Sequence, residues 1–223
     1  MSELQKRLEK LTLRLDHMGM RCEQAVADAI EAIRAKDVDA GLEVDWKDST
    51  IDNAEVEIEQ ECIRLLALYQ PAAIDLRKIC TIIKANNDLE RIADLAANMG
   101  RQVEHIVEED LSFENSVEFN SLAQNVLAIL GKTIRLLSNQ DTSSARNVIE
   151  ADRKIDEGYT TMINNAFDLR ENSGGIPWFL ATVNIAKAME RIGDHCTNIA
   201  EDIIFLKTGD IVRHTMHEHT YDS

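Results

Sequence analysis

The chain has 223 residues, enough for one large or two small domains with a buried core. Its net charge of −16 repels phosphate backbones, which argues against a nucleic-acid binder and favours cations or basic partner surfaces, although the charge could serve solubility alone. No apolar run reaches the roughly 18 residues of a membrane span, and the amino-terminal MSELQKRLEK lacks the apolar segment of a signal peptide.

The composition favours long helices. Apolar residues make up 44% of the chain but aromatic residues only 4%, and the chain has just 9 Gly and 2 Pro. The four cysteines show no paired spacing. We therefore expect them to be small core residues of a protein in a reducing cytosol.

Apolar residues recur at helical spacing along almost the whole chain. The six stripes run from Leu4 to Ile33, Ile51 to Leu65, Ile79 to Ile106, Phe119 to Leu136, Val148 to Leu169, and Phe179 to Leu206. A polar break, EEDLSFENS, separates the third stripe from the fourth, and no useful length alternates with period two. The predicted fold class is all-α, with six long helices.

The three-helix set is duplicated. Asp37 matches Asp141 at the start of the second helix of each set, an offset of 104, whereas the two Glu-Arg-Ile-x-Asp motifs match at an offset of 100. The length change falls between the second and third helices, so the pattern predicts two tandem, pseudo-symmetric three-helix bundles. We place them at residues 1–110 and 111–210, followed by a flexible tail, 211–223, with His214, His217 and His219.

The second and third helices of the first set should form an antiparallel hairpin around Pro71. Asp48 and Asp94 each lie 23 residues from Pro71, and Asp52 and Glu90 each lie 19 residues from it. Since residues four apart share a helix face, the hairpin should bring two pairs of carboxylates level with each other.

The second set repeats this arithmetic around Ser173. Asp152 and Asp194 each lie 21 residues from Ser173, and Asp156 and Glu190 each lie 17 residues from it. Chance supplies single acidic pairs on solvated helices, but does not easily supply the same four acids at mirrored distances twice.

Four carboxylates at one point repel each other unless a cation or protons lie among them. Hard oxygen ligands suit divalent or trivalent metal ions such as Fe, Mn, Mg or Ca, and Zn also accepts carboxylates. The sequence therefore predicts two metal sites, which we call the first and second acidic clusters. They consist of Asp48, Asp52, Glu90 and Asp94, and of Asp152, Asp156, Glu190 and Asp194.

At these residues the chain resembles the PhoU family over about residues 5 to 214. The segments that carry the resemblance are QPAAIDLRKI, LERIAD, MERIGDHCTNIAE and GDIVRH, which begin at Gln70, Leu89, Met189 and Gly209. Ala93 departs from the family, which usually has Gly there in the first copy. The resemblance implies two three-helix bundles and metal clusters on paired acidic motifs, in a cytoplasmic and often dimeric protein.

The resemblance also implies a function, namely negative regulation of phosphate signalling. The expected partners are the ATP-binding subunit of the phosphate ABC transporter and the sensor histidine kinase. Two other readings stay open: a ferritin-like metal oxidase or storage protein, and a plain helical scaffold. The ferritin-like class uses Glu-x-x-His, and none of the six histidines has Glu three residues before it. No nucleophile constellation, Gly-rich phosphate loop or nucleotide motif is present, so we expect no enzyme.

Overall fold

The computed structural model describes residues 2–113, 116–169 and 175–212, and all regular structure within them is α-helical. The helices are α1 (Glu3–Ala35), α2 (Val38–Tyr69), α3 (Ala73–Glu108), α4 (Val117–Asn139), α5 (Thr142–Leu169) and α6 (Gly175–Thr208). The predicted all-α fold of six long helices is confirmed.

The turn between the first two helices is built in the same way in both repeats. Lys36 ends α1 and Gln140 ends α4, both in the left-handed conformation with φ of 56° and 50°. Directly after them, Asp37 and Asp141 each accept a hydrogen bond from the backbone N–H three residues later, at 3.0 and 2.8 Å. The structure thus repeats this helix–turn–helix at an offset of 104 residues.

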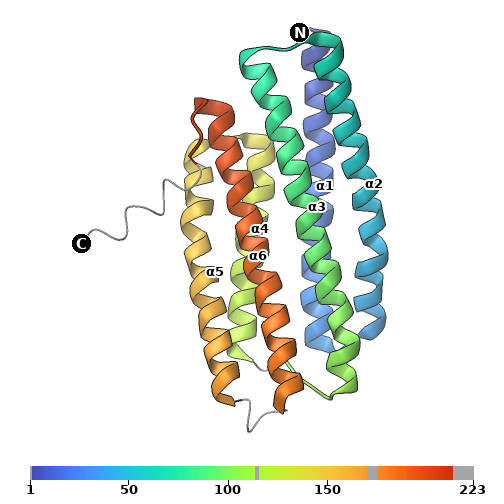
Figure 1. Ribbon diagram of the computed structural model, residues 1–223, viewed down its shortest axis with the longest axis vertical. Coiled ribbons are helices and arrows are strands. Elements are labelled where there is room, and N and C mark those ends of the chain that lie inside the picture. Colours follow the sequence, from blue (N-terminus) through green and yellow to red (C-terminus); the bar gives the residue numbers. More distant parts are fainter. Residues whose placement is uncertain (1, 114–115, 170–174, 213–223) are drawn as a thin grey trace, which may run out of the picture.

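The helices form two three-helix bundles that lie side by side (Figure 1). Helices α1, α2 and α3 pack on one another, as do α4, α5 and α6, and the bundles meet through α3 against α6 and α1 against α4. The outer helices α2 and α5 each contact only the two partners of their own bundle, among the residues described. The 36 residues of α3 span about 54 Å, so the molecule is elongated, as predicted.

Helices α2 and α3 form the predicted first hairpin, and α5 and α6 form the second. The predicted centre of the second hairpin, Ser173, lies outside the described residues. So do the three histidines of the tail. The connection between the bundles falls between Glu108 and Val117. The division into two domains stays a prediction.

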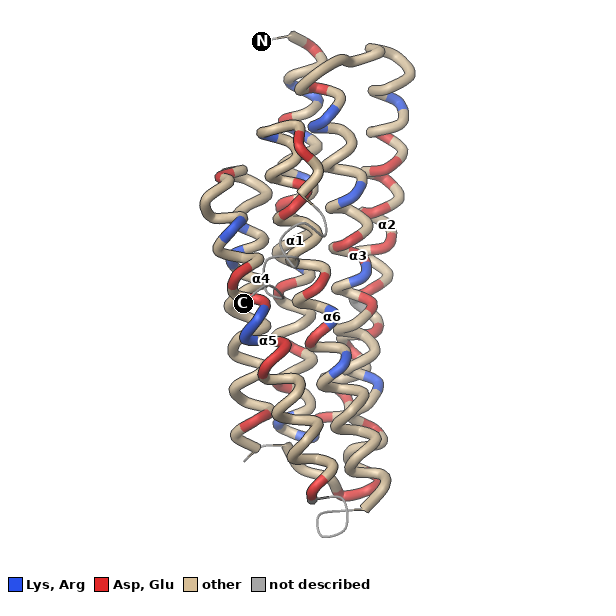
Figure 2. Tube along the Cα trace, turned by 60° about the vertical axis from the view of Figure 1, so that its left-hand side comes forward, with Lys and Arg blue, Asp and Glu red and all other residues tan. Residues whose placement is uncertain are grey.

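One continuous apolar core runs through all six helices. It includes Cys22 of α1, Cys62 of α2 and Cys196 of α6, each with 0% of its surface exposed. Burial raises the pKa of the Cys62 and Cys196 thiols to about 12, so these side chains stay protonated and behave as small apolar residues. Acidic residues outnumber basic ones along the chain, 40 against 24 (Figure 2).

Helices α2 and α3 approach each other closely at Gly41 and Gly100. A Cβ atom at Gly41 would lie 2.6 Å from the carbonyl oxygen of Gly100, and a Cβ atom at Gly100 would lie 2.5 Å from that of Gly41. Only glycine fits at either position, because backbone rather than a flexible side chain occupies the space.

Within the part of the chain that the structure describes, the helices all fall short of the combined length and apolarity that a bilayer crossing requires.

Candidate metal centre

The first acidic cluster is assembled by the hairpin of α2 and α3. Asp48 and Asp52 come from α2, and Glu90 and Asp94 come from α3. Burial, together with the negative charges of Asp52 and Asp94, raises the pKa of Asp48 to about 6. Burial and the charge of Asp94 also raise the pKa of Glu90. The structure therefore brings these four predicted residues into one electrostatically coupled group.

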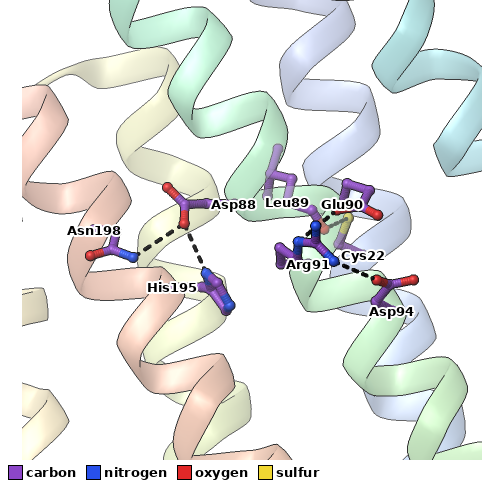
Figure 3. A network of polar contacts seen from close by, with 8 residues as sticks. All are labelled: Cys22, Asp88, Leu89, Glu90, Arg91, Asp94, His195 and Asn198. Carbon is purple, nitrogen blue, oxygen red and sulfur yellow. Dashed lines mark hydrogen bonds and ion pairs between the residues drawn. The ribbon is translucent and has the colours of Figure 1, made fainter.

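Two buried oxygens of the first cluster accept no hydrogen bond. They are Oδ1 of Asp48 and Oε2 of Glu90. Arg91 lies beside the cluster, with Nε 3.4 Å from Glu90 Oε2 and Nη1 3.3 Å from Asp94 Oδ2 (Figure 3). A buried carboxylate oxygen without a donor is costly, and a cation is one species that would remove the cost.

The second acidic cluster repeats this arrangement on α5 and α6. Burial and the charges of Asp156, Asp194 and Glu190 raise the pKa of Asp152 to about 7. Oδ1 of Asp152 is buried and accepts no hydrogen bond. Lys187 supplies the local positive charge, since its Nζ lies 2.8 and 2.7 Å from the two carboxylate oxygens of Glu190.

The two clusters differ at one small residue. Asp152 lies directly over Gly193, where an added Cβ atom would be 2.4 Å from Asp152 Oδ1. The equivalent of Gly193 in the first repeat is Ala93, which is buried. The first cluster thus has a methyl group at the position where the second cluster has none. The two sites therefore share their acids but differ at this small residue.

The acids fit a hard cation in type and in their orphaned oxygens. However, no group of three His, Cys, Asp or Glu side chains within the described ranges is positioned to hold one ion as it stands. Arg91 and Lys187 instead turn toward the acids. Closing a site would require these basic side chains to swing away, which long and exposed side chains can do.

A buried polar group that the sequence analysis missed joins α3 to α6. His195 Nδ1 lies 2.8 Å from Asp88 Oδ1, and Asn198 Nδ2 donates to the same oxygen at 3.2 Å (Figure 3). Asp88 is only 8% exposed. A signal existed in the repeat: the positions equivalent to Asp88 and His195 are the apolar Ala188 and Leu95, both of them buried.

A second polar contact joins α3 to α6, four residues before Asp88 on α3. We call this contact face between the bundles the seam. Lys84 Nζ lies 2.8 Å from Oδ1 of Asp202, whose exposed fraction is 2%, and Thr81 Oγ1 donates to the backbone oxygen of Asp202 at 3.2 Å. The face between the bundles is therefore held by specific polar pairs as well as by apolar packing.

Comparison with protein families matches the PhoU domain to residues 15–103 and 119–203, one match in each repeat. A protein of Pseudomonas aeruginosa named as a phosphate-specific transport system accessory protein PhoU homolog is 35% identical, over 93% of this chain and 86% of its own. An Aquifex aeolicus homolog of the same name is also 35% identical, over 95% of this chain and 96% of its own.

Solved structures with this fold include two PhoU proteins. The crystal structure of PhoU from Pseudomonas aeruginosa has a TM-score of 0.89 at 32% identity and covers 93% of this chain and 100% of that one. The phosphate transport system regulatory protein PhoU from Streptococcus pneumoniae has a TM-score of 0.87 at 26% identity and covers 94% and 99%.

Proposed function

This chain belongs to the PhoU family, and we propose on that basis that it is a non-enzymatic negative regulator of phosphate-starvation signalling and phosphate uptake. In this proposal it binds the ATP-binding subunit of the phosphate ABC transporter and the phosphate sensor histidine kinase. The observation that carries it is the match of the family to both repeats, together with relatives named as accessory proteins of the phosphate-specific transport system.

The surface of α2 supports action by binding. Of the large apolar side chains that this outer helix exposes, four have exposed fractions between 46% and 75%: Trp46, Val56, Ile63 and Leu68. Exposed aromatic and aliphatic side chains on a long helix are typical anchors of a protein interface. The surrounding acids suit partners with basic surfaces, because a net charge of −16 steers such partners toward the chain.

Metal ions form the second part of the proposal. Each acidic cluster holds a divalent or trivalent cation, through Asp48, Asp52, Glu90 and Asp94 in one repeat and through their equivalents Asp152, Asp156, Glu190 and Asp194 in the other. The cation offsets the burial and the mutual repulsion that together raise the pKa values of Asp48 and Asp152. Its role is to fix the spacing of two helices, so it supplies charge and shape rather than chemistry.

The proposed location follows from the partners. A regulator that contacts an ATP-binding subunit and a kinase domain works in the cytoplasm, at the inner face of the membrane. A homodimer would present both partner surfaces twice.

Deletion of the gene tests the regulatory role directly. Cells without it should keep a phosphate-starvation reporter switched on at high phosphate, and expression of the wild-type chain from a plasmid should switch it off. A silent reporter in the deletion strain, together with no association with transporter or kinase at low salt, would refute the regulator and leave a plain helical scaffold.

A pull-down with and without chelator separates the metal from the fold. If the cations shape the partner surface, chelator should reduce recovery of the kinase or the transporter subunit while far-UV circular dichroism stays the same. Oxidase turnover by the iron-loaded protein would instead favour the ferritin-like alternative.

A further inference from the structure

A basic groove lies between α4 and α5, at the end where α4 leads into α5. The cavity has a volume of about 550 Å³ and carries Lys132 and Arg135 from α4 and Lys154 from α5, with Glu150 as its one acid. We call it the α4–α5 groove. The groove lining carries a net charge of +2, on a chain whose total charge is −16.

The three cations are not engaged by carboxylates. Among the residues that the structure describes, Lys132, Arg135 and Lys154 have no Asp or Glu oxygen within 4.0 Å. Another basic cavity, between α1 and α2, differs in this respect. There Arg7 and Arg64 already pair with Glu61, at 3.3 and 3.7 Å.

The first repeat contains the same groove with the opposite charge. At the structural offset of 104 residues, Lys132 and Arg135 correspond to Asp28 and Glu31, and Asn147 corresponds to Glu43. These three acids, together with Asp37, line a cavity of about 270 Å³ between α1 and α2. One backbone therefore supports both charge sets, so the fold does not require the cations of the α4–α5 groove.

The shape of the groove selects the class of anion. Its α5 side runs from Ser144 to Lys154, about 15 Å along the helix, while Lys132 and Arg135 share one face of α4. A ligand with more than one phosphate group can offer oxygens to the cations of both helices at once. Ser144 and Asn147 add neutral hydrogen-bonding side chains between them, and the volume falls in the range of small-molecule sites.

We propose that the α4–α5 groove binds a soluble anion with at least two linked phosphate groups, of the class of pyrophosphate or a nucleoside polyphosphate. The three cations contact the phosphate oxygens, and the matching groove of the first repeat repels the same ligand. This proposal does not rest on the regulatory role, because binding can be measured on the purified chain without a transporter or a kinase.

Calorimetric titration with inorganic pyrophosphate tests the site. The titration uses metal-depleted protein in metal-free buffer at about 0.15 M salt. Under these conditions pyrophosphate cannot bind by way of a metal ion held by the acidic clusters. We expect one site per chain and at least about tenfold weaker binding of orthophosphate. Lys132→Asp/Arg135→Glu, which installs the residues of positions 28 and 31, should weaken pyrophosphate binding by about tenfold or more.

A charge-matched variant serves as the control. Lys6→Asp/Lys10→Glu changes the net charge equally, but in the basic cavity between α1 and α2. Its effect should stay below about twofold, because exposed charges are screened beyond about 8 Å at this salt. Melting curves check that each variant folds. Lys154→Thr, the residue at the equivalent position 50, is a milder variant that should weaken binding about threefold or more.

Four results would overturn the proposal. They are no heat of binding at millimolar pyrophosphate, equal loss in the control variant, orthophosphate binding as tight as pyrophosphate, and binding to phosphatidylserine vesicles without binding to pyrophosphate. The last result would assign the groove to a membrane surface instead.

Discussion

Replacing Asp152 with Asn should stabilise the metal-free protein, and increasingly so as the pH rises. The folded state raises the pKa of Asp152 from 3.8 to about 7 through burial and three neighbouring acids. Between these two values the folded state holds a proton that the unfolded chain has released, so stability falls as the pH rises. Asn has the shape of the protonated acid and never ionises, so the variant escapes this loss.

The raised pKa sets the magnitude. It corresponds to about 4 kcal/mol for a fully shielded side chain, and solvent screening of the partly exposed Asp152 reduces this to about 2 kcal/mol above pH 7. At pH 5.5 only about half of the effect should be present. At pH 8 the melting temperature of Asp152→Asn should exceed that of the wild type by roughly 4–8 °C.

Urea unfolding in metal-free buffer at pH 5.5 and pH 8 measures the difference in unfolding free energy between the variant and the wild type. Both pH values lie above the sequence pI of about 4.7. Asp168→Asn is the matched control, because Asp168 is an exposed acid of the same helix. It should change stability by less than about 0.5 kcal/mol at both pH values. An advantage of Asp152→Asn that is absent, or equal at both pH values, would refute the coupling of the four acids.

Three further predictions concern separate parts of the molecule. Gly100→Ala should destabilise the protein by about 2 kcal/mol or more, since its methyl group would overlap backbone, and an unchanged urea midpoint would contradict the close approach. Glu90→Ala/Asp94→Ala should remove about one site's share of bound metal, measured by elemental analysis, without loss of helical circular dichroism; unchanged metal content would leave these acids as surface charge. His195→Ala should cost about 2 kcal/mol because Asp88 loses a buried partner, whereas an unfolding free energy equal to the wild type would make the pair dispensable.

The helices and the positions of the acidic clusters could be predicted because both depend on local periodicity. Apolar spacing marks each helix, and equal distances from Pro71 place Asp48 opposite Asp94 without knowledge of side-chain rotamers. The orientation of Arg91 and Lys187 could not be predicted, since the rotamer of a long exposed side chain depends on its three-dimensional neighbours.

The seam between the bundles and the α4–α5 groove were hidden for a related reason. The seam joins α3 to α6, two helices that the hairpin arithmetic did not relate to each other. The groove is lined by charges that, in the sequence, look like those of an ordinary solvated helix face. The pairing of Asp88 with His195 spans 107 residues and has no counterpart in the other repeat. Such contacts emerge only when the packing of α3 against α6 is known.

The glycine contact between α2 and α3 bears on how the molecule can move. Where two backbones touch, neither helix can slide along its axis without a collision, so shear between α2 and α3 is blocked and the pair moves as one lever. The equivalent positions in the second repeat are Ala145 and Ala200, both buried. The two repeats thus share an architecture but differ at this contact, and the restraint from touching backbones applies to the first repeat.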